Sequence, residues 1–186
     1  MSRIGTLLAL SALAPWLIAA APLHSMGDVV APHKGDPCSA SRMIAYKRPQ
    51  HGLPPAVQKM RLAIIDACIH CNTKQLEKLG LAGRKNFDFS FSGDKKPSTF
   101  WSAREKSGHR TLGKMVTTLH LPFAHDGHLF IWPSAYGKDP QEKDWDILHE
   151  IYLDRDIILF QNYGGFTGMR LAITDDGDWI YAIEGD

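Results

Sequence analysis

The residues best suited to chemistry are the cysteines and the histidine of the run Cys68-Ile69-His70-Cys71. Cysteines at this spacing can form a redox pair, supply half of a tetrahedral zinc site, or bind copper together with the histidine. However, the run closes a predicted helix, whereas a thioredoxin-like pair opens one, and no second C-x-x-C completes a zinc site. We therefore expect one structural disulfide among Cys38, Cys68 and Cys71, with the pairing left open, and one remaining thiol.

A second group of possible metal ligands lies in the run His125-Asp126-Gly127-His128. With His109 or His120, its two imidazoles could assemble a zinc or copper site. A hairpin turn built on Asp126-Gly127 explains the same residues without a metal. We expect the turn and no cofactor, and keep His70, His125 and His128, together with Cys68 and Cys71, as alternative metal ligands.

A third candidate is a ligand pocket formed by aromatic side chains and an arginine. Trp132 and Trp179 lie in predicted strands, and Arg170 alternates with apolar residues of another strand. An arginine at such a position points away from the core and can hold a carboxylate. Tryptophans at strand spacing usually belong to the core, so core packing is the alternative to a pocket.

Helices are predicted mainly in the first half of the chain. Apolar residues recur at helical spacing after Pro55, which predicts a helix to about His70, and a short helix follows after a cap at Asn72 or Thr73. Two more are expected at residues 98–101 and 111–119. A later helix is predicted to start at Asp139 and run to about residue 152, because a cap, a proline and a carboxylate follow one another there.

Strands are predicted mainly in the second half. Residues 87–91 alternate phenylalanine with polar residues, which predicts a strand with one aromatic face. Residues 129–132 form a brief strand, and residues 169–174 and 179–183 form a C-terminal β-hairpin around Asp176-Gly177. This order predicts an α+β fold, with N-terminal helices packed on one face of a small antiparallel sheet. Residues 157–160 fit either a strand or a helix.

The first 21 residues are typical of a cleavable secretory signal. Arg3 precedes an uncharged apolar run that ends in small residues, and Pro15 interrupts the run. A retained membrane anchor is the alternative, although the run is short for crossing a bilayer. Residues 22–55, rich in proline and glycine, are predicted to form an irregular arm, and residues 56–186 a single α+β domain. Signal cleavage implies a periplasmic or secreted protein with no membrane contact afterwards.

Near the C-terminus, a glycine-rich stretch at residues 164–168 leads to Arg170, then to Asp176-Gly177-Asp178-Trp179 and a terminal Gly-Asp. This pattern resembles a family of small exported bacterial proteins of unknown function. Met169 stands where an aromatic residue is usual in that family. The resemblance implies export and no particular activity or catalytic residue.

These features point towards a binding protein more than an enzyme. The sequence contains neither Gly-x-Ser-x-Gly nor His-Glu-x-x-His, two signatures of hydrolases. Lys and Arg number 21 and Asp and Glu number 20, so the charge gives no case for nucleic-acid binding. We expect a non-enzymatic binding or accessory protein of the periplasm or cell surface, which binds a small molecule or an envelope protein. The alternative is a metal- or thiol-dependent enzyme, or a metal-handling protein, that uses Cys68, Cys71 and the histidines.

Overall fold

A computed structural model describes residues 35, 37–43, 50–82, 87–94 and 96–185, so the predicted signal at residues 1–21 lies outside the described residues. Helices come first along the chain and most strands come later, as predicted. The α-helices are α1 Pro55–Ile69, α2 Thr73–Leu81, α3 Pro97–Lys106, α4 Thr111–His120, α5 Glu142–Asp146 and α6 Asp154–Asn162. The strands are β1 Ala124–Asp126, β2 Leu129–Trp132, β3 Arg170–Thr174 and β4 Trp179–Ile183, and two 3₁₀ turns are η1 Ser134–Tyr136 and η2 Ile147–Glu150.

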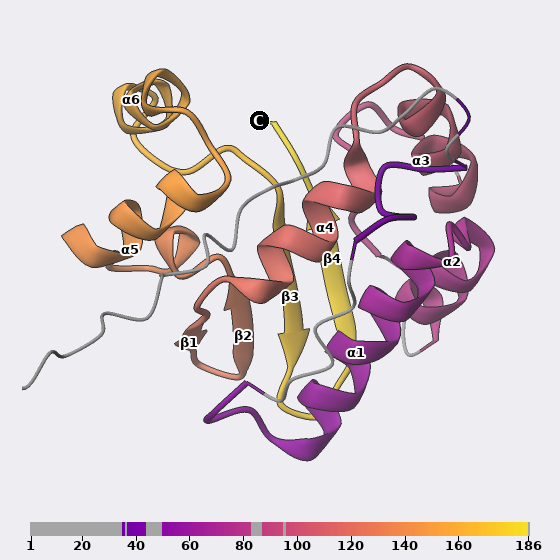
Figure 1. Cartoon of the computed structure of the whole chain (residues 1–186). Coiled ribbons are helices and arrows are strands. Elements are labelled where there is room, and N and C mark those ends of the chain that lie inside the picture. The colour runs from indigo at the N-terminus through magenta and orange to yellow at the C-terminus, as the bar shows by residue number, and fades with distance from the viewer. Residues whose placement is uncertain (1–34, 36, 44–49, 83–86, 95, 186) are drawn as a thin grey trace, which may run out of the picture.

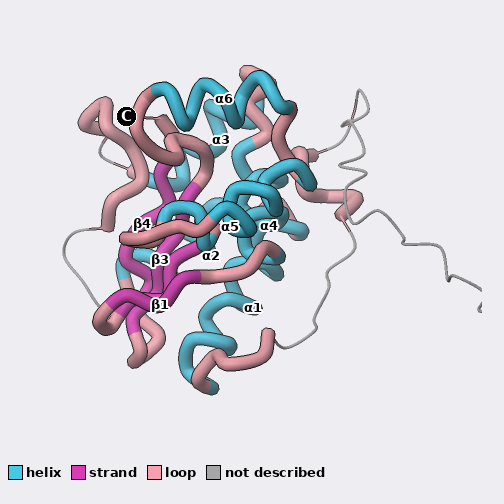
Figure 2. Tube along the Cα trace, turned by 90° about the vertical axis from the view of Figure 1, so that its left-hand side faces the viewer, coloured by secondary structure: helices cyan, strands magenta, loops and turns pink. Residues whose placement is uncertain are grey.

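The four strands form one antiparallel sheet in the order β1-β2-β3-β4. Trp132 on β2 lies opposite Leu171 on β3, and Arg170 on β3 lies opposite Ile183 on β4. In Figure 1, α4 crosses in front of β3 and β4 and α1 lies beside β4, whereas Figure 2 shows the strands to one side of these helices. The α+β fold class and the C-terminal hairpin are therefore confirmed.

The backbone amides in the first turns of α2, α3 and α4 are hydrogen-bonded by side chains. For α3 and α4 the side chain comes from the preceding helix. Asn72 accepts a hydrogen bond from the Gln75 amide and so caps α2 through its own side chain. The first turn of α3 instead uses Glu77 of α2, whose Oε2 accepts from the Ser98 amide at 3.0 Å. The first turn of α4 uses Glu105 of α3 in the same way. Each carboxylate joins two consecutive helices while it satisfies a backbone donor.

The main core lies between the helices and the sheet. Its largest fully buried members are the indoles of Trp101, Trp132 and Trp179. Trp101 stacks on Trp179, with ring centroids 5.8 Å apart. Arg61 of α1 is also buried; its Nε donates to the Leu119 carbonyl of α4 at 2.8 Å, and burial lowers its pKa to about 10. This bond fixes the last turn of α4 against α1.

A second, smaller hydrophobic cluster lies beside the sheet, around α5, η2 and α6. Its buried members are Leu121, Ala135, Leu148, Ile157 and Phe166. It is built from short elements: α5 has five residues and α6 has nine. The ambiguous residues 157–160 belong to α6 and are helical.

The predicted strand at residues 87–91 is wrong. Asp88 makes a single isolated parallel bridge to Tyr181, and no ladder follows. The hydroxyls of Ser90 and Ser92 bond instead to the Asp94 carboxylate, which closes a local turn that competes with strand pairing. Phe87 still packs as expected of an aromatic face, because it is buried against Trp179.

The helix predicted from Asp139 begins later than expected and is shorter. Its N-cap is Gln141, and Asp144 accepts a hydrogen bond from the Gln141 amide in a reciprocal capping box. The α-helix ends at Asp146 and continues only as the 3₁₀ turn η2. The helix start was therefore predicted two residues too early, and its capping box uses Gln141 and Asp144 in place of Asp139 and Glu142.

Candidate functional site

Arg170 begins β3 on the sheet face opposite α1 and α4. Its neighbours Met169 and Leu171 belong to the main core, and strand alternation places Arg170 on the other side. The sequence predicted this direction correctly. The sequence did not predict that Arg170 is buried, with only 5% of its surface exposed.

The guanidinium of Arg170 lies among carbonyls and aromatic rings. Nη1 donates to Gly168 O at 3.2 Å and Nη2 donates to Gly185 O at 2.8 Å. The guanidinium carbon lies 4.8 Å from the ring centroid of Tyr136 and 5.7 Å from that of Phe91. These contacts stabilise a buried cation by hydrogen bonds and by cation–π attraction.

One donor of this guanidinium is unused. The buried Nε of Arg170 has no hydrogen-bond partner among the described residues. No ion pair between described residues includes Arg170 either, since the acids nearby pair with other groups: Glu184 binds Arg104 at 2.9 Å and also binds Lys114. A buried N–H that lacks an acceptor costs free energy, of order 1–3 kcal/mol, unless a ligand supplies one.

Tyrosines complete the surroundings of Arg170. The Tyr181 ring lies against that of Tyr136, with centroids 6.4 Å apart. Burial raises the pKa of Tyr152 and of Tyr181, while the positive charge of Arg170 acts in the opposite direction on both. Both phenols therefore keep their protons at neutral pH and remain able to donate hydrogen bonds.

The rings above Arg170 are the accessible part of this group. Phe91 is 58% exposed and Tyr136 is 37% exposed, although both are large and apolar. Phe91 lies after the single bridge at Asp88, within the turn that Ser90 and Ser92 close on Asp94, and no strand ladder includes it.

The two tryptophans predicted to share a pocket with Arg170 lie elsewhere. Trp132 is 0% exposed and its Nε1 donates to Gln50 Oε1 at 3.0 Å, and Trp179 is 1% exposed and donates to Tyr181 O at 2.8 Å. Both indoles are packed in the main core with satisfied N–H groups. The structure thus separates Arg170 from Trp132 and Trp179, and offers neither indole to a ligand.

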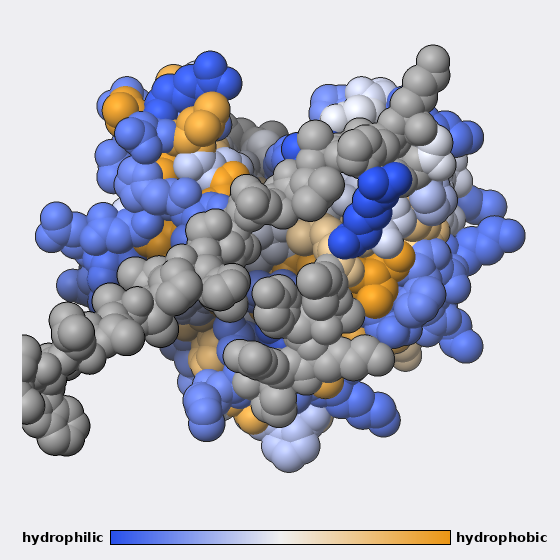
Figure 3. Space-filling model, in the orientation of Figure 1, coloured by the Kyte–Doolittle hydropathy of each residue, from blue (hydrophilic) through white to orange (hydrophobic). Residues whose placement is uncertain are grey.

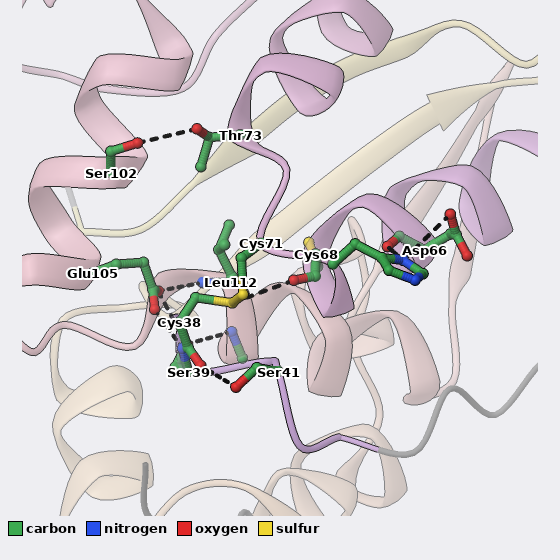
Figure 4. Close-up of a disulfide and its surroundings, with 12 residues drawn as sticks. Cys38, Ser39, Ser41, Asp66, Cys68, Cys71, Thr73, Ser102, Glu105 and Leu112 are labelled. Carbon is green, nitrogen blue, oxygen red and sulfur yellow. Dashed lines mark hydrogen bonds and ion pairs between the residues drawn. A yellow bond between two sulfur atoms is a disulfide. The ribbon is translucent and has the colours of Figure 1, made fainter. Parts of the chain in front are cut away.

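The three cysteines resolve into one disulfide and one buried thiol. Cys38 and Cys71 are bonded across 33 residues, and Figure 4 shows the sulfur of Cys68 lying apart from them. Cys68 is fully buried, and burial raises the pKa of its thiol, with the charge of Glu105 acting in the same direction. The expected single disulfide is present, and it joins the arm to the end of α1.

The arm segment behind this disulfide is held by more than the S–S bond. Glu105 accepts from the Ser39 amide at 2.6 Å and from its hydroxyl at 3.0 Å, as Figure 4 shows. The Ser39 hydroxyl in turn accepts from the Gly113 amide of α4. A cavity of about 380 Å³ opens beside the disulfide, and Thr73 and Ser102, which line it, are joined by a hydrogen bond of 3.0 Å. These contacts make the disulfide region a structural junction of α1, α3 and α4.

The histidine candidates occupy exposed positions. His125 lies on β1 and its Nε2 is 3.2 Å from Asp175 Oδ1, and His128 follows the turn at Gly127, whose positive φ of 61° suits glycine. His70 lies at the end of α1 beside Asp66. Among the described residues, no group of three or more His, Cys, Asp or Glu side chains is arranged to hold a metal ion.

The residues that sequence reasoning missed are the aromatic partners of Arg170. Tyr136 comes from η1 and Phe91 from the turn after residue 88, and Gly185 comes from the C-terminal end. No periodicity links these positions to residue 170. The only signal in the sequence was the arginine itself, at an outward position of a strand.

Comparison with known proteins gives no further identification. No protein-family model, no curated protein and no solved structure matches the chain. None of the helices among the described residues is long and apolar enough to cross a membrane.

Proposed function

We propose that this chain is an exported, non-enzymatic binding protein that holds the carboxylate of a small molecule at Arg170. The observation that carries the proposal is the buried Arg170 guanidinium, whose Nε has no acceptor among the described residues. A carboxylate is the planar, acceptor-only group that matches the guanidinium fork. Burial makes the unpaired Nε–H of Arg170 unfavourable. For the same reason, a hydrogen bond from this group to an anion would be strong.

The aromatic rings support an aromatic or otherwise apolar body for this ligand. Phe91 and Tyr136 lie over the guanidinium and remain exposed, so a ligand that displaces Phe91 would still contact a ring. Protonated tyrosines nearby could donate to the second carboxylate oxygen. The site therefore favours an aromatic carboxylate over a simple inorganic anion.

The alternative of a thiol-dependent enzyme has less support. Cys71 is bonded to Cys38, and the remaining thiol of Cys68 is fully buried with a raised pKa. The reactive form of cysteine is the thiolate, which such burial disfavours. Export is proposed on the apolar N-terminal segment together with the disulfide, because disulfides persist in oxidising compartments.

The test is thermal unfolding of the mature, oxidised chain with increasing benzoate, acetate or benzamide. Benzoate should raise Tm in a saturable way, since a ligand at about 100 times its Kd adds about 2.7 kcal/mol to the stability of the folded state. Benzamide, which has the same ring and no charge, should have little effect, and acetate should bind more weakly than benzoate.

Three variants distinguish the site from a general effect of salt. Arg170→Met should abolish the response to benzoate, and Arg170→Lys should weaken it, because lysine keeps the charge and loses the fork. Arg155→Met removes an exposed arginine, 78% accessible on α6, and should respond like the wild type. An equal response in all four proteins, or none in the wild type, would contradict the proposal.

Export has its own test, independent of the ligand. The full-length chain is expressed in a Gram-negative host and recovered from the periplasm, and its intact mass is measured. The expected mass is that of a chain beginning near residue 21 or 22 with one disulfide. A full-length mass in the cytoplasmic fraction would contradict export while leaving the Arg170 site open to its own test.

A further inference from the structure

The chain is nearly neutral as a whole, but its charges are unevenly distributed between the α1–α4 region and the α5–α6 region. Within 51–120, which includes α1 to α4, the described residues comprise nine Lys and Arg against five Asp and Glu. Residues 138–163, which include α5 and α6, contain three Lys and Arg against seven Asp and Glu. The molecule therefore has a basic helical side and an acidic side, separate from the Arg170 site.

The acidic side also carries most of the exposed apolar side chains. Seven large hydrophobic side chains are exposed among the described residues, and four of them lie on or next to α6. We call these four the α6 patch: Leu153, 59% exposed, Ile158, 55%, Leu159, 48%, and Tyr163, 72%. Figure 3 shows hydrophobic atoms interleaved with hydrophilic ones on this flank, at the upper left. Such a cluster on a nine-residue helix marks an interaction surface.

The basic side contains a groove of matching character. It has a volume of about 490 Å³ and lies along α3. Phe100 and Ala103 supply its apolar wall. Its rim holds Lys96 and Asp94, and also Arg104, which is paired with Glu184. We call it the α3 groove. Arg104 lies 5.7 Å from the centroid of the Phe100 ring, so charge and apolar surface are adjacent there.

The two surfaces lie on opposite flanks of the molecule. In Figure 1, α5 and α6 are at the left and α3 is at the right, with the sheet and α4 between them. A contact between the α6 patch and the α3 groove would therefore join different flanks of two copies. The acids beside the α6 patch, among them Asp154 with 86% of its side chain exposed, would then face Lys96.

We infer that this chain associates head to tail with further copies of itself, the α6 patch of each copy docking in the α3 groove of the next. A symmetric dimer through two α6 patches is disfavoured, because it would bring two acidic surfaces together. A heterologous contact between two different surfaces generates rings or open chains of copies. The contact is small, four apolar side chains with a charged rim, and belongs among weak, transient interfaces.

The test is sedimentation velocity of the oxidised mature chain, from about 5 μM to about 500 μM, the range in which weak interfaces of this size associate. The average mass should rise with concentration. Raising the ionic strength from about 0.05 M to about 0.5 M should weaken association about tenfold, since screening acts on the charged rims. Benzoate is omitted, so the result does not depend on the Arg170 site.

Variants on each surface locate the contact. Ile158→Asp should weaken association at least tenfold, because it places a further charge in an apolar contact. Lys96→Glu should do the same on the groove side. Lys59→Glu, an equal charge change at an exposed position on α1, is the matched control and should associate like the wild type.

A charge swap provides the most specific outcome. Lys96→Glu combined with Asp154→Lys and Glu150→Lys in one chain should restore association that Lys96→Glu alone removes. A wild type that stays monomeric at every concentration overturns the inference. So does association that Ile158→Asp leaves unchanged, or that Lys59→Glu weakens as much as Lys96→Glu. Binding of the basic side to anionic lipid vesicles in place of self-association also overturns it.

Discussion

The α1–α4 side of the molecule and the α5–α6 side are built differently. The first packs on the sheet through fully buried tryptophans, and its helices are joined to one another by capping carboxylates and to residue 38 by a disulfide. The second has a cluster of five buried residues and leaves four large apolar side chains exposed around a single helix. The difference indicates a division of roles, in which the first side maintains the fold and the second presents a surface.

The largest expected effect comes from truncating an indole of the main core. Trp101→Ala should lower the free energy of unfolding by about 3–5 kcal/mol, because it removes a ring that is 0% exposed and stacked on Trp179. Trp145→Ala, in the half-buried rim of the second cluster, should cost about half as much. Urea unfolding followed by far-UV circular dichroism measures both. Equal losses would remove the distinction between the two sides.

The disulfide should have the next largest effect. The double variant Cys38→Ser, Cys71→Ser should lose about 2–4 kcal/mol, since it removes a cross-link over 33 residues. Reductant should lower the stability of the wild type by a similar amount and leave the double variant unchanged. Unfolding midpoints in urea, with and without a dithiol, check both statements. A wild type insensitive to reduction would show that Ser39 and Glu105 alone hold the arm.

A smaller, pH-dependent effect is expected at the cap shared by α2 and α3. Hydrogen bonds from Ser98 hold the pKa of Glu77 below its usual value. Its contribution is therefore complete above the unfolded-state pKa of about 4.3 and is lost as the pH falls through the lower folded-state pKa. Glu77→Gln should cost about 1 kcal/mol at pH 7 and less near pH 3. Stability measured over this range, with exposed Glu150→Gln as the control, tests it; a constant difference would contradict the mechanism.

The smallest effect on stability should come from the α6 patch. Leu159→Ser should change the free energy of unfolding of the monomer by no more than about 0.5 kcal/mol, because the side chain is already 48% exposed. Denaturation at low protein concentration measures it. A loss comparable to that of Trp145→Ala would mean that Leu159 belongs to the second cluster.

The sequence predicted the elements whose periodicity and burial agree. α1 and the C-terminal hairpin were predicted because apolar residues recur at helical spacing in α1 and alternate with other residues along both strands. Residues 87–91 have the same alternation and form no strand, because local side-chain bonds of Ser90 and Ser92 take over from a ladder. The alternation of apolar and polar residues indicates which side chains can face a core. It does not indicate whether the edge of a neighbouring strand is free to pair.

The candidate site was predictable only in part, for a related reason. The outward direction of Arg170 follows from strand alternation, but its burial depends on Tyr136 and Phe91, which tertiary folding brings from distant segments. The disulfide partner of Cys38 also depended on folding, because three cysteines allow three pairings. The turn of Cys71 into the left-handed region, with φ of 54°, is likewise a property of the folded chain.

The most direct test of the Arg170 site is the NMR signal of its own Nε–Hε group. This signal is identified in ¹⁵N-labelled protein by its loss in Arg170→Lys, and is then followed as benzoate is added. We predict a large, saturable downfield shift of this proton, as the unpartnered donor acquires a carboxylate acceptor, with other arginine signals nearly unchanged. A signal that does not move while benzoate is shown to bind, or one that shifts no more than that of exposed Arg155, would contradict the account.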